Sequence, residues 1–359
     1  MTTPFVSVLI DTYNHEHFIE EAIQSVLSQD FPASEREILV VDDGSTDRTP
    51  EILAKFASQI RILRKPNGGQ ASAFNHGFPE CRGELIAFLD ADDWWAPDKL
   101  MRVTNAMAAD PKVGFIGHGI ITVFPDGTRR TEVLRDGFCF QANDLSGAQL
   151  FRRRCAFMGT SRMTVRRDIL QRIGPIPTDI LIQADEYIYT LASVLMPMRI
   201  LPEPLAYYRL HADNAFHMLN ASPEKLRRKQ ESLAALAKTL SQRLAQLGVD
   251  PEVRGALLGY TQASADQLRL SLDGGWPWET VGTEWKVYRL THPNAPAIHR
   301  IFKSLVLLAA LLIPPRKFYQ TQKALAQSGL YRRVRERWLP FPEMEHVESD
   351  RAASQGSPR

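Results

Sequence analysis

Groups of acidic residues follow short apolar runs near the start of the chain. The strongest group comes directly after the run at residues 85–89 and reads Asp90-Ala91-Asp92-Asp93. Carboxylates this close repel one another unless a cation neutralises them. Their oxygens suit a hard divalent ion such as Mg²⁺ or Mn²⁺, which keeps open positions for phosphate oxygens. The sequence therefore predicts a divalent-metal site here; the alternative is an acidic cap on a helix expected to begin near residue 97.

Two other polar groups also stand at the ends of apolar runs. They are Asp11-Thr12-Tyr13-Asn14, after residues 6–10, and Asp42-Asp43-Gly44-Ser45, after residues 37–41. A loop with two glycines, at residues 67–70, precedes an expected helix. Glycines there would let the backbone come close to a nucleotide, whereas the alternative is a plain glycine turn.

The elements that must position these groups alternate between strands and helices. The apolar patterns predict strands at 6–10, 37–41, 60–63, 85–89 and 113–116, and helices at 18–27, 49–57, 70–78 and 97–109. This alternation is typical of a mostly parallel sheet covered by helices. Such sheets place ligands beyond the carboxyl ends of their strands, so we expect the polar groups to meet there in an open α/β fold.

Four motifs, in their order and spacing, resemble those of the family 2 glycosyltransferases, which have the Rossmann-like GT-A fold. The motifs lie at residues 8–14, 40–47, 67–75 and 90–92, and the resemblance covers roughly residues 5–215. It implies inverting transfer of a sugar from a nucleotide diphosphate, with uridine diphosphate the leading carrier. The chain departs from the family at Thr12, where proline is more common, and at Phe74, where a basic residue is frequent.

The resemblance also implies roles for single residues. Tyr13 would stack on the nucleotide base, and Asp42 would accept a hydrogen bond from the base. Asp92 would hold the metal, and Asp90 would reach toward the ribose or the ion. The implied donor-binding set is Thr12, Tyr13, Asn14, Asp42, Asn67, Gly69, Gln70, Asn75, Asp90, Ala91 and Asp92.

A second metal ligand is implied in the segment at residues 208–211. Its last residue, His211, stands where the family has a histidine that approaches the diphosphate and the metal. A neutral imidazole is an acceptable ligand. The alternative is a histidine with a purely structural role.

The acceptor hydroxyl must lose a proton, and a carboxylate is the natural general base. Asp185 and Glu186, within residues 183–188, resemble the family's acidic motif at this place. In one pattern of the family the base is the acid directly after an alanine, which is Asp185 here. In the commoner pattern the base is the second acid, which is Glu186 here. We favour Asp185. The alternative is that both acids cap the helix expected to run to residue 195.

Composition limits the remaining possibilities. The 359 residues include only three scattered cysteines, too few for a disulfide framework, and this favours a reducing cytosol. We expect no signal peptide and no transmembrane helix, because the longest apolar run, 305–313, is far shorter than the ~18–20 residues that span a bilayer. The formal net charge of +2 gives no reason to expect a nucleic-acid partner.

Positive charge is concentrated in residues 299–342, which carry nine basic residues and one acidic residue. Cations flank the apolar run at 305–313, and Tyr331 and Trp338 accompany four arginines further on. This pattern predicts a segment that lies on an anionic, cytoplasmic membrane face and brings the enzyme to a glycan or lipid-linked acceptor. The alternative is a helix that packs on the catalytic domain and presents a basic rim.

We therefore expect a GT-A domain at 1–218, a helical extension at 219–342 beginning with an amphipathic helix at 223–247, and a disordered tail at 343–359. One rival function is a sugar-nucleotide pyrophosphorylase, which would show a glycine-rich, arginine-containing loop after the first strand. Another is a catalytically silent protein that only binds nucleotide sugars.

Overall fold

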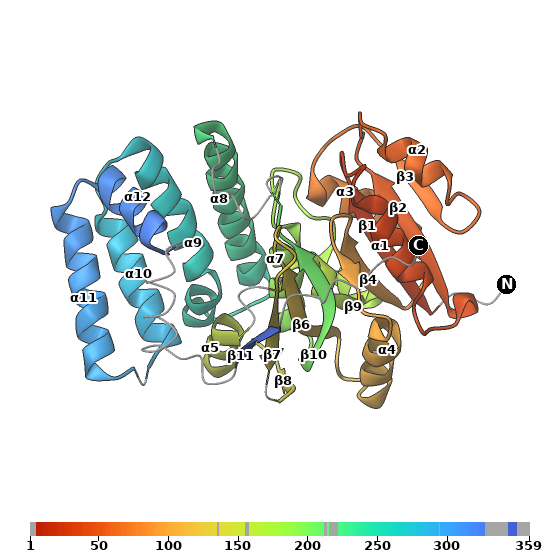
Figure 1. The fold of residues 1–359 in the computed structure, drawn as a ribbon. Coiled ribbons are helices and arrows are strands. Elements are labelled where there is room, and N and C mark those ends of the chain that lie inside the picture. The colour runs from red at the N-terminus through yellow and green to blue at the C-terminus, as the bar shows by residue number, and fades with distance from the viewer. Residues whose placement is uncertain are drawn as a thin grey trace.

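The structure is a computed structural model that describes residues 5–134, 136–154, 158–211, 214, 222–293, 295–326 and 344–349. Figure 1 shows an α/β part that holds both the parallel strands and the helices around them, and a set of C-terminal helices beside it. The predicted α/β class is confirmed.

Four parallel strands form the N-terminal half of the sheet. They lie in the order β3, β2, β1, β4 and comprise β1 (Val6–Thr12), β2 (Arg36–Asp42), β3 (Arg61–Arg64) and β4 (Leu85–Asp90). In register, Asp11 lies opposite Asp90, and Thr12 lies opposite Asp42. The polar groups predicted at three strand ends therefore share one edge of the sheet.

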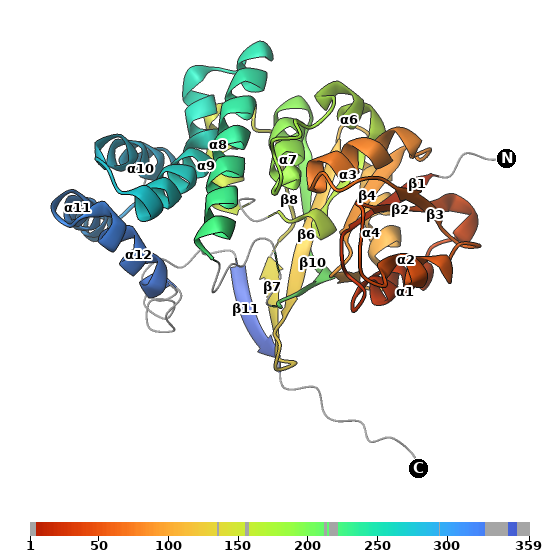
Figure 2. The ribbon, with the colours of Figure 1, turned by 90° about the horizontal axis from the view of Figure 1, so that it is seen from above.

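Helices bury both faces of this half, which explains its near-continuous apolar strands. One face packs against α1 (Ile19–Leu27), α2 (Thr49–Ala54) and α4 (Lys99–Ala109). The other face packs against α3 (Gln70–Gly77), α6 (Arg167–Ile173) and α7 (Ala184–Leu195). Figure 2 shows these two sets on opposite sides of the strands.

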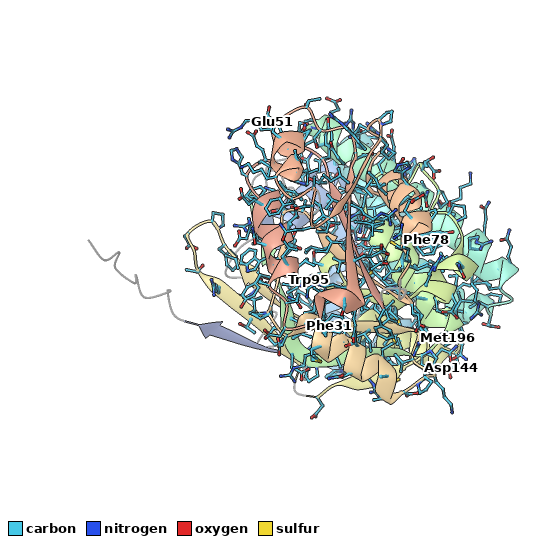
Figure 3. The ribbon with its side chains drawn as sticks, turned by 90° about the vertical axis from the view of Figure 1, so that its right-hand side faces the viewer. Phe31, Glu51, Phe78, Trp95, Asp144 and Met196 are labelled. Atoms are coloured by element: carbon cyan, nitrogen blue, oxygen red, sulfur yellow. The ribbon has the colours of Figure 1, made fainter. Side chains whose placement is uncertain are left out.

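The other half of the sheet is built around β6 (Phe115–Val123) and the long strand β10 (Met198–Arg209), which run parallel. β6 forms a hairpin with β7 (Arg129–Leu134) through a turn at residues 124–128. β10 also pairs with β8 (Phe138–Phe140) and with β5 (Trp94–Trp95). The pairing with β5 brings the residues after β10 to the acidic group that follows β4. Trp95, labelled in Figure 3, is buried.

The short strand β9 (Thr164–Arg166) joins the two halves by pairing with both β4 and β6. Three 3-10 turns and one helix complete this part: η1 (Ala33–Glu35), η2 (Phe78–Glu80), η3 (Thr160–Arg162) and α5 (Leu145–Arg154). All the strands and helices predicted over residues 6–116 are present, and the strand expected at 113–116 continues to Val123.

Five helices follow: α8 (Pro223–Gln246), α9 (Pro251–Asp273), α10 (Trp278–Thr291), α11 (Ala297–Leu312) and α12 (Pro315–Ala326). Ser222 and Asp250 cap α8 and α9 with their side chains, and a proline opens each helix. Apolar residues of α8 and α9 belong to the same core cluster as those of α3, α5 and α7. One hydrophobic core therefore crosses the domain boundary predicted at 218/219.

Part of the segment expected to be a disordered tail forms a strand. β11 (Met344–Ser349) pairs antiparallel with β7 at the edge of the sheet, which corrects the prediction for these six residues. The physical reason is that an edge strand offers unpaired backbone groups to any extended segment within reach. The rest of that tail, Tyr331, Trp338 and the arginines near them lie outside the described residues. Among the described helices, none is both long enough and apolar enough to cross a bilayer.

Candidate active site

The acidic group after β4 lies against the end of β1. Asp90, Asp92 and Asp93 each offer a carboxylate oxygen, and these oxygens lie within 4.8 Å of one another. The Asp11 carboxyl group contacts that of Asp90; burial raises the pKa of Asp11 to about 7, and burial and the Asp11 charge raise that of Asp90 well above its usual range. Asp11 Oδ1 is buried and accepts no hydrogen bond from the described residues. Crowded acids with a spare buried oxygen fit a divalent cation.

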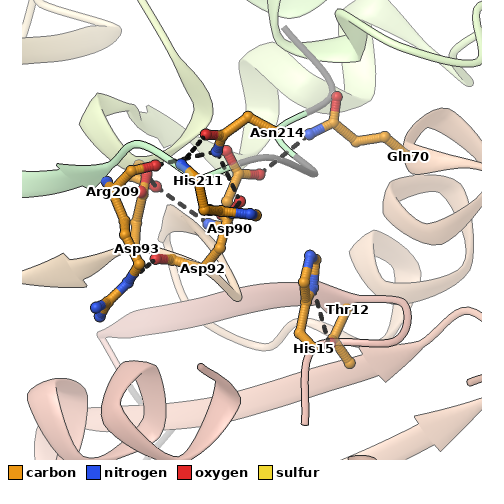
Figure 4. A network of polar contacts seen from close by, with 10 residues as sticks. Thr12, His15, Gln70, Asp90, Asp92, Asp93, Arg209, His211 and Asn214 are labelled. Atoms are coloured by element: carbon orange, nitrogen blue, oxygen red, sulfur yellow. Dashed lines mark hydrogen bonds and ion pairs between the residues drawn. The ribbon is translucent and has the colours of Figure 1, made fainter. Parts of the chain in front are cut away.

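Asp92 is held by the segment that follows β10 (Figure 4). His211 Nε2 lies 3.0 Å from Asp92 Oδ2, and the Asn214 amide donates to the same oxygen at 3.3 Å. Burial by itself would raise the pKa of Asp92, but the hydrogen bond with His211 and nearby positive charge hold it below its usual value. The structure thus brings together the two residues predicted to hold the metal.

Asp93 has a different role from its two neighbours. Its carboxylate accepts the Ser161 hydroxyl at 2.6 Å and the Arg209 backbone N–H at 3.1 Å. The Ser161 carbonyl in turn accepts the ammonium of Lys99, which is buried over the Trp95 ring. Asp93 therefore positions η3 and the end of β10, and Asp90 and Asp92 are the acids with oxygens to spare.

The residues predicted to read the base lie beside the end of β2. Tyr13 is 43% exposed and so presents a ring to solvent. Asp42 is buried, and its Oδ1 accepts the Ser45 N–H at 2.8 Å in a tight turn. Its Oδ2 lies 3.4 Å from Arg64 Nε and accepts no hydrogen bond from the described residues. One oxygen of Asp42 thus shapes the turn, and the other is buried beside the Arg64 guanidinium.

The glycine loop is fixed by a residue that the sequence interpretation did not assign. The Asp43 carboxylate accepts the backbone N–H groups of Gly68 and Gly69, the latter at 2.7 Å, and pairs with Lys65. Gly69 has a φ of +80°, which favours glycine. Asn67 is exposed on this loop, and its backbone N would lie 2.8 Å from a Cβ at Gly44. The loops after β2 and β3 therefore touch, and Asp43 was detectable only as the neighbour of Asp42.

Two predicted donor residues hold loops in place. Asn14 has a φ of 57°, and its side-chain oxygen accepts the Thr46 N–H at 2.8 Å, which ties the loop after β1 to that after β2. Asn75 was expected at the donor, but both polar atoms of its amide bond the backbone of Ile176, at 2.6 and 2.8 Å. Both polar atoms of the Asn75 amide therefore hold the loop before α7. Thr12 and Ala91 are buried at the ends of β1 and β4.

Gln70 bridges the donor side and the start of α7. Its amide nitrogen donates to Asp90 Oδ1 and to the Thr160 hydroxyl, both at 3.1 Å, and its amide oxygen accepts the Ala184 N–H at 3.2 Å. The first residue of α3 thus fixes the distance between the acidic group and the predicted base.

Asp185 and Glu186 lie in the first turn of α7 but in different surroundings. Asp185 Oδ1 accepts the Glu186 N–H at 2.8 Å, and burial raises the pKa of Asp185 to about 7. Glu186 is buried, and its Oε1 lies 3.4 Å from the Arg152 guanidinium of α5 and accepts the Thr261 hydroxyl of α9. We call the contact of these three residues the Arg152–Glu186–Thr261 seam. It occupies the Glu186 carboxylate in joining α7 to the helices behind it.

Tyr208 connects the two groups of acids. Burial, followed by the negative charges of Asp93, Asp92, Asp90 and Asp185, raises the pKa of the Tyr208 hydroxyl. The charge of Asp185 also raises the pKa of Asp90. The negative charges of the strand-end acids and of Asp185 therefore act on one hydroxyl, that of Tyr208, a residue that the sequence interpretation did not assign to the site.

Known proteins resemble this chain in sequence and in fold. Residues 7–174 match the family model described as Glycosyl transferase family 2. An uncharacterized glycosyltransferase of Nostoc sp. is 33% identical over 256 residues, which are 69% of this chain and 78% of that protein. Other curated relatives match over 29–60% of their own length.

Two solved structures share the fold. S. aureus TarS in complex with UDP-GlcNAc has a TM-score of 0.57 at 17% identity and covers 90% of this chain and 92% of that one. The mannosyltransferase PcManGT from Pyrobaculum calidifontis, in complex with GDP-Man and Mn²⁺, has a TM-score of 0.50 at 20% identity and covers 94% and 88%. Identities this low show a common architecture and leave the ligands of this chain to be argued from its own residues.

Proposed function

This chain belongs to glycosyl transferase family 2, and from that premise we propose that it is an inverting enzyme that transfers a sugar from a nucleotide diphosphate, with a UDP-sugar favoured, to a hydroxyl of a glycan or lipid-linked acceptor. The observation that supports this most is the position of Gln70, whose amide donates to Asp90 and accepts the N–H of Ala184, the residue before Asp185. We assign the activity to the cytoplasm.

The donor would lie across the ends of β1, β2 and β4. Tyr13 offers an exposed ring for stacking on a base, and Asp42 Oδ2 is placed to accept a hydrogen bond from it. The diphosphate would lie beside the glycine loop, which Asp43 keeps in shape by accepting the N–H groups of Gly68 and Gly69.

Asp92 and His211 would hold a divalent cation, Mg²⁺ or Mn²⁺, with Asp90 beside them. The residues fit such an ion, since Asp11 and Asp90 share a site in which two negative charges are unfavourable without one. When bound, the cation would stabilise the negative charge of the departing diphosphate.

Asp185 would act as the general base. Its raised pKa, about 7, suits removal of a hydroxyl proton near neutral pH, whereas the Glu186 carboxylate is committed to Arg152 and Thr261. A base on the acceptor side, opposite the departing diphosphate, gives a single displacement with inversion at the anomeric carbon.

The test begins with calorimetric screening of nucleotide sugars in Mn²⁺, because the donor's base and sugar follow directly from the one that binds. Release of nucleotide diphosphate is then measured for wild type, Asp92→Ala and the surface control Asp98→Ala, whose side chain pairs with Arg102 on α4. We expect metal-dependent release in wild type and the control and its loss in Asp92→Ala. Unchanged turnover in Asp92→Ala would overturn the metal assignment, and donor binding without any release would indicate a silent binding protein.

A further inference from the structure

Helix α11 presents its large apolar side chains to solvent. Six of them are between 50% and 76% exposed: Ile298, Ile301, Phe302, Leu305, Leu308 and Leu312. At 100° per residue these six fall within about 120° of the helix circumference, and no charged residue occupies that sector. We call them the outward stripe. A stripe this continuous is unlike the scattered apolar residues found on most protein surfaces.

A buried charged contact fixes this orientation. On the side of α11 away from the stripe, Lys303 donates to Glu284 Oε2 of α10 at 2.8 Å, and Tyr319 of α12 donates to the other oxygen at 3.3 Å. Glu284 is only 7% exposed. Rolling α11 to bury the outward stripe would leave a buried carboxylate unpaired, which is strongly unfavourable. The contact between Lys303 and Glu284 therefore keeps the apolar face of α11 turned toward solvent.

The surroundings of the outward stripe are cationic. No acidic residue occurs between Glu284 and Glu336, and Arg300, Arg316 and Lys317 are exposed. Two further exposed side chains, Trp276 and Trp278, lie near the start of α10. The Arg316 guanidinium donates to the Leu272 carbonyl at the C-terminal end of α9. Because Trp276 and Trp278 follow α9 directly, the cations after α11 lie near these two tryptophans. Like charges on the rim oppose pairing with a second copy and favour an anionic partner.

We propose that the outward stripe docks onto a membrane rich in anionic lipid. α11 would lie in the plane of the interface, with its apolar side chains among the acyl chains and with Arg316 and Lys317, which follow its C-terminus, at the phosphate headgroups. Both Figure 1 and Figure 2 place α11 at the outer edge of the molecule, where no other helix stands between it and a flat surface. The inference rests on the proposed function only for the acceptor, since a lipid-linked acceptor would share this surface.

Flotation of the full chain with vesicles tests the docking without any donor or acceptor. The vesicles are phosphatidylcholine alone or phosphatidylcholine with phosphatidylglycerol, at low and high salt. The stripe variant is Ile301→Gln with Leu305→Gln and Leu308→Gln, and the matched control is Ile62→Gln with Met101→Gln and Leu247→Gln, three exposed apolar residues on other elements. All six positions are exposed, so we expect both variants to fold, and thermal unfolding checks this.

We expect wild type and the control to float with anionic vesicles and the stripe variant to float at least tenfold less. A second variant, Lys317→Glu, should weaken binding to anionic vesicles and leave the apolar residues intact. Recovery of wild type in the soluble fraction with every vesicle, or equal flotation of the stripe variant, overturns the proposal. A wild-type dimer that the stripe variant converts to a monomer, without flotation, would show that a second copy covers the stripe. Diphosphate release in detergent-free buffer reports on the proposed function separately.

Discussion

Buried carboxylates hold neighbouring elements in place both at the strand-end site, which is polar, and beneath the outward stripe, which is apolar. At the site, Asp93 is hydrogen-bonded to Ser161 and Arg209, and Glu186 is bonded to Arg152 and Thr261. This leaves Asp90, Asp92 and Asp185 for the roles that we propose. In the C-terminal helices, Glu284 is committed to Lys303 and Tyr319, and this leaves an apolar face in solvent. In both regions the buried carboxylate has a structural role, and we propose that neighbouring residues carry the function.

The largest expected effect is the loss of sugar transfer on replacing Asp185, which should leave membrane binding through the outward stripe unchanged. Asp185→Asn should lower sugar transfer about 10³-fold, within the range for loss of a general base, and leave donor affinity and vesicle flotation unchanged. Steady-state transfer and calorimetry measure this, with Asp179→Asn as an exposed control on the preceding loop. Retained transfer in Asp185→Asn would move the base assignment elsewhere.

The second prediction tests whether Glu186 stabilises the fold through its contact with Arg152. Glu186→Ala leaves the buried Arg152 guanidinium without its partner, and we expect a loss of about 3–5 kcal/mol in the free energy of unfolding. Denaturant unfolding measures it. The double variant Arg152→Met with Glu186→Met should recover most of the stability, since no unpaired charge remains. A Glu186→Ala enzyme as stable as wild type but inactive would make Glu186 the base.

The pH profile sharpens the contrast between Asp185 and Glu186. A base must be deprotonated, and because burial raises the pKa of Asp185 to about 7, transfer should rise about tenfold per pH unit up to pH 7 and level off above it. The same shift stabilises the fold below the ordinary aspartate pKa, and that contribution is lost as pH rises through about 7. Transfer rates between pH 5 and pH 9 measure the first effect. A flat profile across this range would contradict the assignment of Asp185.

The smallest effect concerns the reassigned Asn75. Asn75→Ala removes both bonds to the Ile176 backbone, and we expect a loss of about 1–3 kcal/mol in stability with the KM for the donor nearly unchanged. Unfolding and donor-dependence measurements check the two parts, with exposed Asn105→Ala as control. A large rise in KM at unchanged stability would restore Asn75 to the donor site.

The sequence was sufficient to place the strands and the acids at their ends. Alternating apolar runs define a parallel sheet, and sugar transfer requires particular residue types, so Asp42, Asp90, Asp92 and Asp185 stand out from the chain around them. His211 lies beside Asp92 because β10 returns the chain to this edge of the sheet, and its role as a metal ligand stays a prediction.

The missed features depend on partners distant in sequence. Ser161 acts on Asp93 and on Lys99 from across the fold through an ordinary hydroxyl and a carbonyl. Glu186 could not be told from a base without Arg152 and Thr261, 34 and 75 residues away. The apolar pattern of α11 fitted a packed helix and a membrane face equally well, and only the contact between Lys303 and Glu284 decides which way it faces.

The Arg152–Glu186–Thr261 seam bears on how the chain can be recombined with its relatives. A chimera joined at 218/219 would divide one hydrophobic core and give Glu186 a foreign helix in place of Thr261. A junction at Gly274-Gly275 would keep α8 and α9 with the catalytic half and exchange only α10–α12. The incoming helix at the position of α10 would have to pack closely against Gly259 of α9, where a Cβ would lie 2.1 Å from Val287. Joined there, the surface that α11 presents could be exchanged between enzymes while each keeps its own sugar chemistry.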